Sequence, residues 1–185
     1  MTNPLFALVT PLVLDLSGAG NFAFTPAPVA FDVYGTGETV NVGWPVGEVG
    51  FLALDLNANG AVDSGVELFG DATVMIADAS RTAEQGFQAL AQYDQDKNGV
   101  IDQRDAIFPK LIVWVDKNGD AKSAKEEIQS LDHYKITSLG LGFHAVSSPM
   151  GNGQALPLLM GRFSAQDAQG RRTTGVLADI YLRIF

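Results

Sequence analysis

At 185 residues and 46% hydrophobic content, the chain is long enough to bury one substantial core within the usual size of a single domain. Its formal net charge of -9 argues against a nucleic-acid partner, which requires a clustered basic face. The chain has no cysteine, which excludes disulfides and thiolate metal sites. It also has no apolar run of about 18 residues that would span a membrane.

The predicted elements begin with short strands. Apolar runs separated by Gly, Pro, Asn and Asp fill residues 1–80, which is typical of short β-strands joined by turns. From Thr82 the pattern changes, because Thr82 and Gln85 have capping-box spacing and apolar residues follow at helical spacing. This pattern predicts a helix of about three turns that runs into Asp94. A further short helix is expected to end at Phe108, because Pro109 cannot continue it.

The rest of the chain mixes both kinds of element. The run LIVWV at 111–115 predicts a buried strand, a second helix is expected over 124–131, and the tail predicts a β-hairpin that turns near Gln169 and Gly170. The predicted class is α+β, with short β-strands and hairpins and a few short helices around EF-hand-like calcium loops. We expect one calcium-binding domain over 1–185. It can be divided into a mainly β and loop part, 1–80, and an EF-hand-like pair plus a C-terminal β-hairpin, 81–185.

Acidic residues are unevenly distributed along these elements. Residues 1–80 carry nine acidic and no basic residues, whereas residues 81–185 carry twelve of each. Composition leaves two interpretations open: a solvated acidic surface, or carboxylates that bind divalent cations. The positions of the acidic residues must decide between them.

The segment 94–105, DQDKNGVIDQRD, has the pattern of an EF-hand calcium loop. Such a loop needs oxygen ligands at positions 1, 3, 5, 7, 9 and 12 and a sharp turn, usually Gly, at position 6. Gly99 holds position 6, and Ile101 at position 8 is the apolar residue that lets such a loop pair with a neighbour. Asp at position 12 in place of Glu predicts moderate affinity. The predicted ligands are Asp94, Asp96, Asn98, Asp102, Asp105 and the carbonyl of Val100.

Two further segments follow the same pattern with one departure each. In the segment 116–127 the departure is Ala121 at position 6, where positive φ is expected and a Cβ is strained. In the segment from Asp55 the closing carboxylate, Glu67, stands at position 13. Turns without metal remain the alternative for all three loops. The predicted ligands are Asp116, Asn118, Asp120, Glu127 and the carbonyl of Lys122 in one loop, and Asp55, Asn57, Asn59, Asp63, Glu67 and the carbonyl of Ala61 in the other.

Two segments that start at Asp15 and Asp32 resemble eroded versions of the same loop. Each keeps Asp at position 1 and Gly at position 6 but lacks most of the other carboxylates. A turn without metal is the favoured interpretation for both.

Several strings resemble a known family in their order. They are ELFGD at 67–71, GFQAL at 86–90, Phe108, the VW at 113–114, PLVLDLSGAG from Pro11 and VAFDVYGTGETVNVGW from Val29, together with the loops from Asp94 and Asp116. This arrangement resembles the calcium-binding region of RTX-type secreted proteins of Gram-negative bacteria, and in particular the self-processing module of iron-regulated RTX proteins. The resemblance covers at least residues 11–140.

The resemblance implies calcium-triggered folding after secretion and, in some members, autocatalytic cleavage of an Asp-Pro bond before the PLVLDL-like strand. Here Thr10 precedes Pro11, and no proline in the chain follows an aspartate, so self-processing at such a bond is predicted to be absent. The apolar stretch 1–16 has no basic residue and contains Pro4 and Pro11, which argues against a conventional cleaved signal peptide. Secretion by another route is therefore expected.

The predicted function is a calcium-binding structural or interaction module of a secreted bacterial protein, with Ca²⁺ as its cofactor. The alternative is a calcium-dependent self-processing module that has lost or altered its cleavage site. An enzyme is the less favoured interpretation, because His133 and His144 are isolated and no serine stands in a nucleophile-elbow motif. Calcium ions are the expected partners, with no nucleic acid and no membrane span, and a protein or cell-surface partner stays open.

Overall fold

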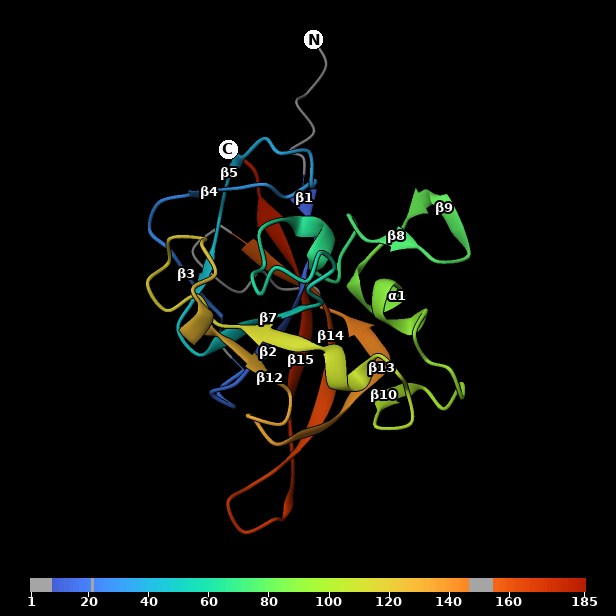
Figure 1. Cartoon of the computed structure of the whole chain (residues 1–185). Coiled ribbons are helices and arrows are strands. Elements are labelled where there is room, and N and C mark those ends of the chain that lie inside the picture. Colours follow the sequence, from blue (N-terminus) through green and yellow to red (C-terminus); the bar gives the residue numbers. More distant parts are fainter. Residues whose placement is uncertain (1–7, 21, 147–154) are drawn as a thin grey trace.

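The computed structural model describes residues 8–20, 22–146 and 155–185. Residues 1–7, which begin the apolar stretch considered above as a leader, lie outside this part. The fold is built on one antiparallel sheet in which eight strands follow the order β10-β13-β14-β15-β2-β7-β11-β12, with β1 paired to β15 (Figure 1). The strands are β1 (Leu8–Val9), β2 (Leu12–Asp15), β7 (Val49–Ala53), β10 (Val100–Asp102), β11 (Ile112–Trp114), β12 (Ile128–Ser130), β13 (Ile136–Ala145), β14 (Ala155–Gln166) and β15 (Arg172–Arg183).

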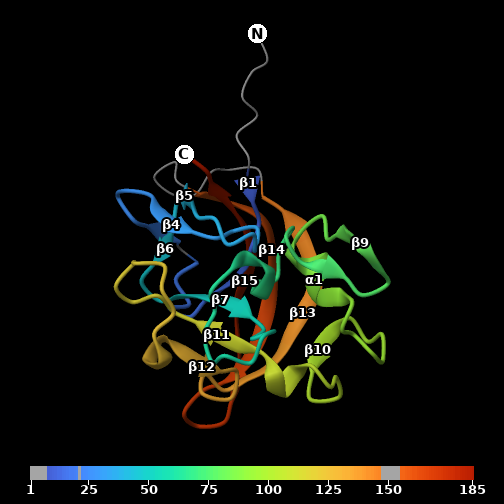
Figure 2. The same cartoon turned by 45° about the horizontal axis from the view of Figure 1, so that its top comes forward.

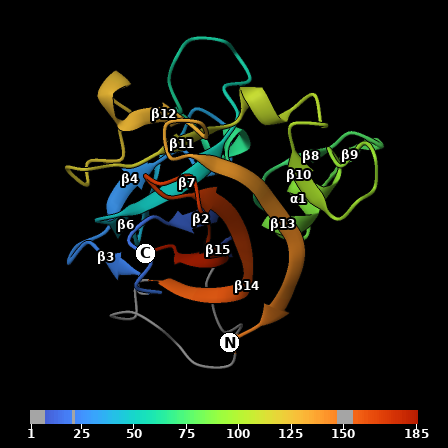
Figure 3. The ribbon, with the colours of Figure 1, turned by 90° about the horizontal axis from the view of Figure 1, so that it is seen from below.

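The sheet curls into a half-barrel, and Figure 3 shows the long strands β13 and β14 curving strongly around β15 and β2. Smaller elements flank it, with β9 and α1 on one side and β4, β5 and β6 on the other (Figure 2). The two-stranded pairs are β3 (Ala23–Phe24) with β6 (Pro45–Val46), β4 (Val29–Phe31) with β5 (Val40–Val42), and β8 (Val74–Met75) with β9 (Asp78–Thr82). The helical elements are α1 (Gly86–Ala91) and the 3-10 turns η1 (Gly65–Glu67), η2 (Phe108–Lys110) and η3 (Lys125–Glu127).

Both faces of the central strands are buried, which explains their unbroken apolar runs. In β2, Leu12 and Leu14 enter one hydrophobic cluster, whereas Val13 enters the other. The second cluster contains four aromatic rings in mutual contact, with centroids 4.7 to 5.8 Å apart. These rings are Phe31, Trp44, Phe51 and Trp114.

The predicted α+β class is wrong, because the described chain is essentially all-β with one short α-helix. The helix expected over residues 82–94 spans only Gly86–Ala91, since Thr82 instead pairs with Val74 in a β-hairpin. The side chain of Gln85 caps this helix and accepts hydrogen bonds from the backbone N-H groups of residues 87 and 88. No helix in the described residues is both long and apolar enough to cross a membrane.

Two other helix predictions also fail. The helix expected over 124–131 is a single 3-10 turn followed by β12, because Ile128 pairs with Trp114 of β11. The helix expected before Pro109 is a 3-10 turn that contains this proline, whose missing N-H is not required in a first turn. Strand pairing therefore overrides helical spacing at residues 128–130. The strand over 111–115 and the C-terminal hairpin are confirmed.

Candidate metal centre

The loop from Asp94 joins α1 to β10 and brings three carboxylates together. One oxygen each from Asp94, Asp96 and Asp105 lies within 4.8 Å of the other two, a spacing at which these groups could hold a metal ion. Asp94 accepts hydrogen bonds from the backbone N-H groups of Asn98 (3.2 Å) and Gly99 (2.9 Å). These bonds fold the loop around its first carboxylate.

The residue at position 12 of this loop is buried, whereas the residue at position 9 binds an arginine side chain. Asp105 is only 1% exposed and accepts the backbone N-H groups of Gln95 (2.8 Å) and Asp102 (3.0 Å). The carboxylate of Asp102 instead accepts Arg104 Nε (3.1 Å) and Nη2 (2.8 Å), and these bonds lower the pKa of Asp102. The guanidinium of Arg104 also lies 3.4 Å from Asp96. The structure thus gathers three of the predicted acidic ligands, and Asp102 is not in that group.

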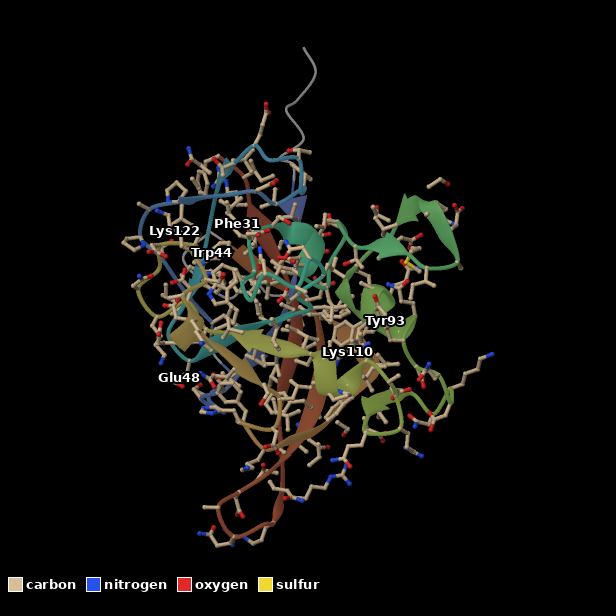
Figure 4. The ribbon with its side chains drawn as sticks, in the orientation of Figure 1. Phe31, Trp44, Glu48, Tyr93, Lys110 and Lys122 are labelled. Carbon is tan, nitrogen blue, oxygen red and sulfur yellow. The ribbon has the colours of Figure 1, made fainter. Side chains whose placement is uncertain are left out.

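The loop from Asp116 is anchored in the aromatic cluster. Asp116 is 2% exposed and accepts Trp44 Nε1 (2.7 Å) and the backbone N-H groups of Gly119 (2.8 Å) and Ala121 (2.7 Å). Ala121 has φ of 57°, the left-handed conformation expected at position 6. Figure 4 shows Trp44 inside the fold beside the loop that carries Lys122. Asn118 Nδ2 donates to Asp120 (3.0 Å), whose other oxygen accepts the N-H of Lys122 (2.9 Å).

The late closing carboxylate of the loop from Asp55 has the same role as those of the other two loops. Glu67 accepts the backbone N-H groups of Leu56 (3.1 Å) and Asp63 (3.0 Å), which are positions 2 and 9. Asp105 and Glu127 accept the N-H groups of the same two positions in their own loops. Both glutamates end a 3-10 turn, Glu67 in η1 and Glu127 in η3.

The other predicted ligands of this loop lie near its surface. Asn59 Nδ2 and Asn57 Nδ2 donate to Asp63 at 2.7 and 3.5 Å, and the N-H of Ala61 donates to Asn59 at 2.8 Å. Asp55 accepts the N-H of Gly60 at 2.8 Å.

All five loops contain the same backbone turn, including the two eroded ones. Positions 4 and 6 have positive φ in each, and the carboxylate at position 1 accepts the N-H of position 6. Among the described residues, only the loops from Asp55, Asp94 and Asp116 also have a buried closing carboxylate. This carboxylate accepts hydrogen bonds from the backbone N-H groups of positions 2 and 9. The turn alone therefore does not specify a metal site, and the closing acid distinguishes the three stronger candidates.

The loops from Asp55 and Asp116 contact each other directly. The N-H of Val62, at position 8 of one loop, donates to the hydroxyl of Ser123, at position 8 of the other, at 2.7 Å. Ile101, the equivalent residue of the loop from Asp94, pairs instead with Leu139 of β13. The contact between the residues at position 8 thus joins the loop from Asp55 to the loop from Asp116.

Comparison with known proteins agrees with this architecture of strands and acidic loops. Residues 12–182 match the SPM domain, the self-processing module. The chain belongs to the SPM domain family. This SPM domain is 37% identical over 175 residues to the iron-regulated protein FrpA of Neisseria meningitidis serogroup C. The alignment covers 93% of the chain but only 15% of FrpA. The resemblance to iron-regulated RTX proteins is confirmed, and it is consistent with secretion.

This SPM domain also contains a pair of acidic residues outside the loops, of which Asp179 is fully buried and Asp71 is half-buried. Asp179 of β15 is fully buried, and burial raises its pKa to about 8, an effect increased by the charge of Asp71. Burial also raises the pKa of Asp71, although the backbone N-H of Thr10 and of neighbouring residues lower it. Asp71 lies in the string ELFGD at 67–71, and Asp179 lies in the string LADIYL at 177–182. These two strings are the sequence features that could have indicated the pair.

Proposed function

We propose that this chain is a calcium-binding structural module of a secreted bacterial protein that is stabilised by Ca²⁺. The observation that carries the proposal is the convergence of Asp94, Asp96 and Asp105 within 4.8 Å. At that distance each pair of carboxylates repels by roughly 1 to 4 kcal/mol, depending on the local dielectric. A divalent cation converts this repulsion into attraction.

The chemistry of the loops favours Ca²⁺ over other metals. All predicted ligands are carboxylate, amide or backbone oxygens, which hard cations prefer. The cluster of Asp94, Asp96 and Asp105 consists of carboxylates, with no histidine among its described members, and the chain has no cysteine. A flexible loop with many oxygen ligands suits Ca²⁺ better than Mg²⁺, which requires near-octahedral geometry.

Thermal unfolding with and without calcium tests the proposal. At a free Ca²⁺ concentration of about 100 times the dissociation constant, one site adds roughly 2.7 kcal/mol, which raises the melting temperature by about 5 to 10 °C. Replacing Asp105 with Asn should reduce the rise, whereas Asp132→Asn, at a side chain 92% exposed, is the matched control. Equal melting temperatures in calcium and in EDTA would refute the proposal.

A second function, self-processing in an altered form, is supported by the family and by one contact. The backbone N-H of Thr10 donates to Asp71 of the string ELFGD at 3.1 Å, so an acidic group lies beside the Thr10-Pro11 peptide. Incubation of the native chain with millimolar Ca²⁺, followed by mass spectrometry, tests this function. A new N-terminus at Pro11 would support this function, whereas a native chain that stays intact would overturn it.

A further inference from the structure

A pocket lies where β2 ends and the hairpin of β14 and β15 continues beyond it. β15 pairs with β2 only over residues 177–179, so residues 172–176 extend past β2 with β14 still paired on their other side. Figure 1 shows this hairpin extending below the rest of the sheet. The pocket has a volume of about 290 Å³ and is lined by residues 15–18, Tyr134 and the two strands of the hairpin. This volume is close to that of small-molecule sites in proteins.

The two hairpin strands form an apolar floor with a hydroxyl beside it. Gly175 pairs with Phe163, and a Cβ at Gly175 would stand 2.2 Å from Phe163 Cζ, so the tip of the ring fills the place of a side chain at 175. Ala165 and Thr173 form a further pair, two residues along each strand. Since residues two apart face the same side of a sheet, Thr173 lies on the same face as Phe163.

Tyr134, in the turn between β12 and β13, adds a second aromatic ring to the lining. It is half-buried, and burial together with the charge of Glu48 raises the pKa of its phenol. Glu48 therefore lies near this hydroxyl, and Figure 4 shows Glu48 at the edge of the fold. Among the described residues, the hydroxyls of Tyr134 and Thr173 have no hydrogen-bond partner. Both groups are available to a ligand.

The charge of the pocket excludes an ionic ligand. Of the described residues that line it, only Asp15 is charged, and Asp15 is 1% exposed. Its Oδ1 accepts the N-H (3.0 Å) and the hydroxyl (2.6 Å) of Ser17, and its Oδ2 accepts the N-H of Gly20 (2.6 Å). An anion would find no cation in the lining, and a cation would find only a carboxylate that the loop already occupies.

Two aromatic rings beside neutral hydrogen-bonding groups suit a sugar ring. A pyranose has C-H groups on its faces and hydroxyls around its edge, so it needs apolar contact and neutral donors and acceptors together. A purely apolar ligand would instead cover the hydroxyls of Tyr134 and Thr173 without pairing them, which costs free energy. We propose that this pocket binds a neutral sugar unit, with Tyr134 and Phe163 against the ring and Thr173 and Gln166 on its hydroxyls.

Titration of the full chain, followed by NMR in saturating Ca²⁺, tests the proposal. The probes are methyl glucoside, methyl galactoside and N-acetylglucosamine, each added alone. One ring of about 13 to 15 non-hydrogen atoms in an open pocket should bind with a dissociation constant in the millimolar range. The backbone amide signals of residues 16–18, 134 and 173–175 should shift saturably with at least one probe. Those of residues 78–82 in β9, which do not line the pocket, should not shift.

Side-chain variants locate the binding. Tyr134→Ala should weaken it about tenfold or more, the usual cost of truncating a central aromatic contact. Thr173→Val keeps the shape and removes one hydroxyl, so it should weaken binding about two- to tenfold. Tyr34→Ala is the matched control, because Tyr34 is a 46% exposed tyrosine of the loop from Asp32 and does not line the pocket. If Tyr134→Ala does not fold, Tyr134→Phe replaces it and should weaken binding to the same extent as Thr173→Val.

Three results would overturn the inference. The first is that none of the three sugars shifts the signals of the pocket residues. The second is that the Tyr134 and Thr173 variants bind the sugar as the native chain does. The third is that putrescine, a diamine, shifts the same signals at lower concentration than every sugar, which would make the pocket a cation site. Each of these results leaves calcium binding by the loops standing, because equal melting temperatures in calcium and in EDTA are the separate sign that the first proposed function fails.

Discussion

Replacement of Asp179 by Asn should change how stability depends on pH. Asp179 is fully buried on β15, and burial raises its pKa from 3.8 to about 8. Asn has nearly the same shape, and its amide oxygen can keep accepting the N-H of Gly86. Its amide nitrogen can donate to the Thr10 hydroxyl, which has no hydrogen-bond partner among the described residues. The variant therefore removes the ionisation and leaves the packing largely intact.

The size of the effect follows from the raised pKa. The folded state holds the proton more tightly than the unfolded state, so the stabilisation is fully present below pH 3.8 and is lost as the pH rises through about 8. The slope is about 1.4 kcal/mol per pH unit, and the whole loss is roughly 5 kcal/mol. Asp179→Asn should thus match the native chain near pH 4 and exceed its stability by about 3 to 5 kcal/mol near pH 8.

Urea unfolding followed by tryptophan fluorescence measures this difference, because Trp44 and Trp114 are both fully buried. The same saturating Ca²⁺ at every pH keeps the loops comparable in the two proteins. Asp132→Asn is the control and should change stability by less than about 0.5 kcal/mol at any pH. If the native chain and Asp179→Asn gave parallel pH profiles, the account of a buried neutral acid would be wrong.

Three further predictions concern the loops and the close contact at Thr10. Asp94→Ala should remove one calcium ion from the stoichiometry measured by calorimetry, whereas Asp15→Ala should remove none, because the loop from Asp15 has no closing carboxylate. Ala121→Gly should relieve the backbone strain of an alanine with positive φ, but it also removes a buried methyl group worth about 0.8 kcal/mol. The calcium affinity of the loop from Asp116 should therefore change by less than about fivefold in a titration. Gly70→Ala should lower the free energy of unfolding by more than about 2 kcal/mol in urea titrations, since its Cβ would lie 2.2 Å from the Thr10 oxygen.

The sequence predicts the strands better than the helices. Unbroken apolar runs indicate β2 and β7 because both faces of these strands are buried. Helical spacing near Thr82 and Ile128 is misleading because each residue has a strand partner elsewhere in the chain. Helical periodicity cannot reveal such pairing, because the partners, Val74 and Trp114, lie outside the segments predicted to be helical.

Ligand spacing predicts where the candidate metal loops lie, but not the direction of every side chain. Asp102 holds position 9 of its loop, yet Arg104 two residues later binds its carboxylate. The pair of Asp71 and Asp179 is invisible to spacing arguments, because pairing of β15 with β2 brings Asp179 to Leu12, beside Thr10. Position 8 of the loop from Asp94 has the expected residue, Ile101, but its partner is a strand of the sheet.

Calorimetric titration of the metal-free chain with Ca²⁺ tests calcium binding by the three loops. We predict saturable binding of three ions, one each at the loops from Asp55, Asp94 and Asp116. A variant in which Asn replaces Asp94, Asp96 and Asp105 should bind one ion fewer than the native chain. No saturable uptake, or equal uptake by the native chain and this variant, would contradict the account.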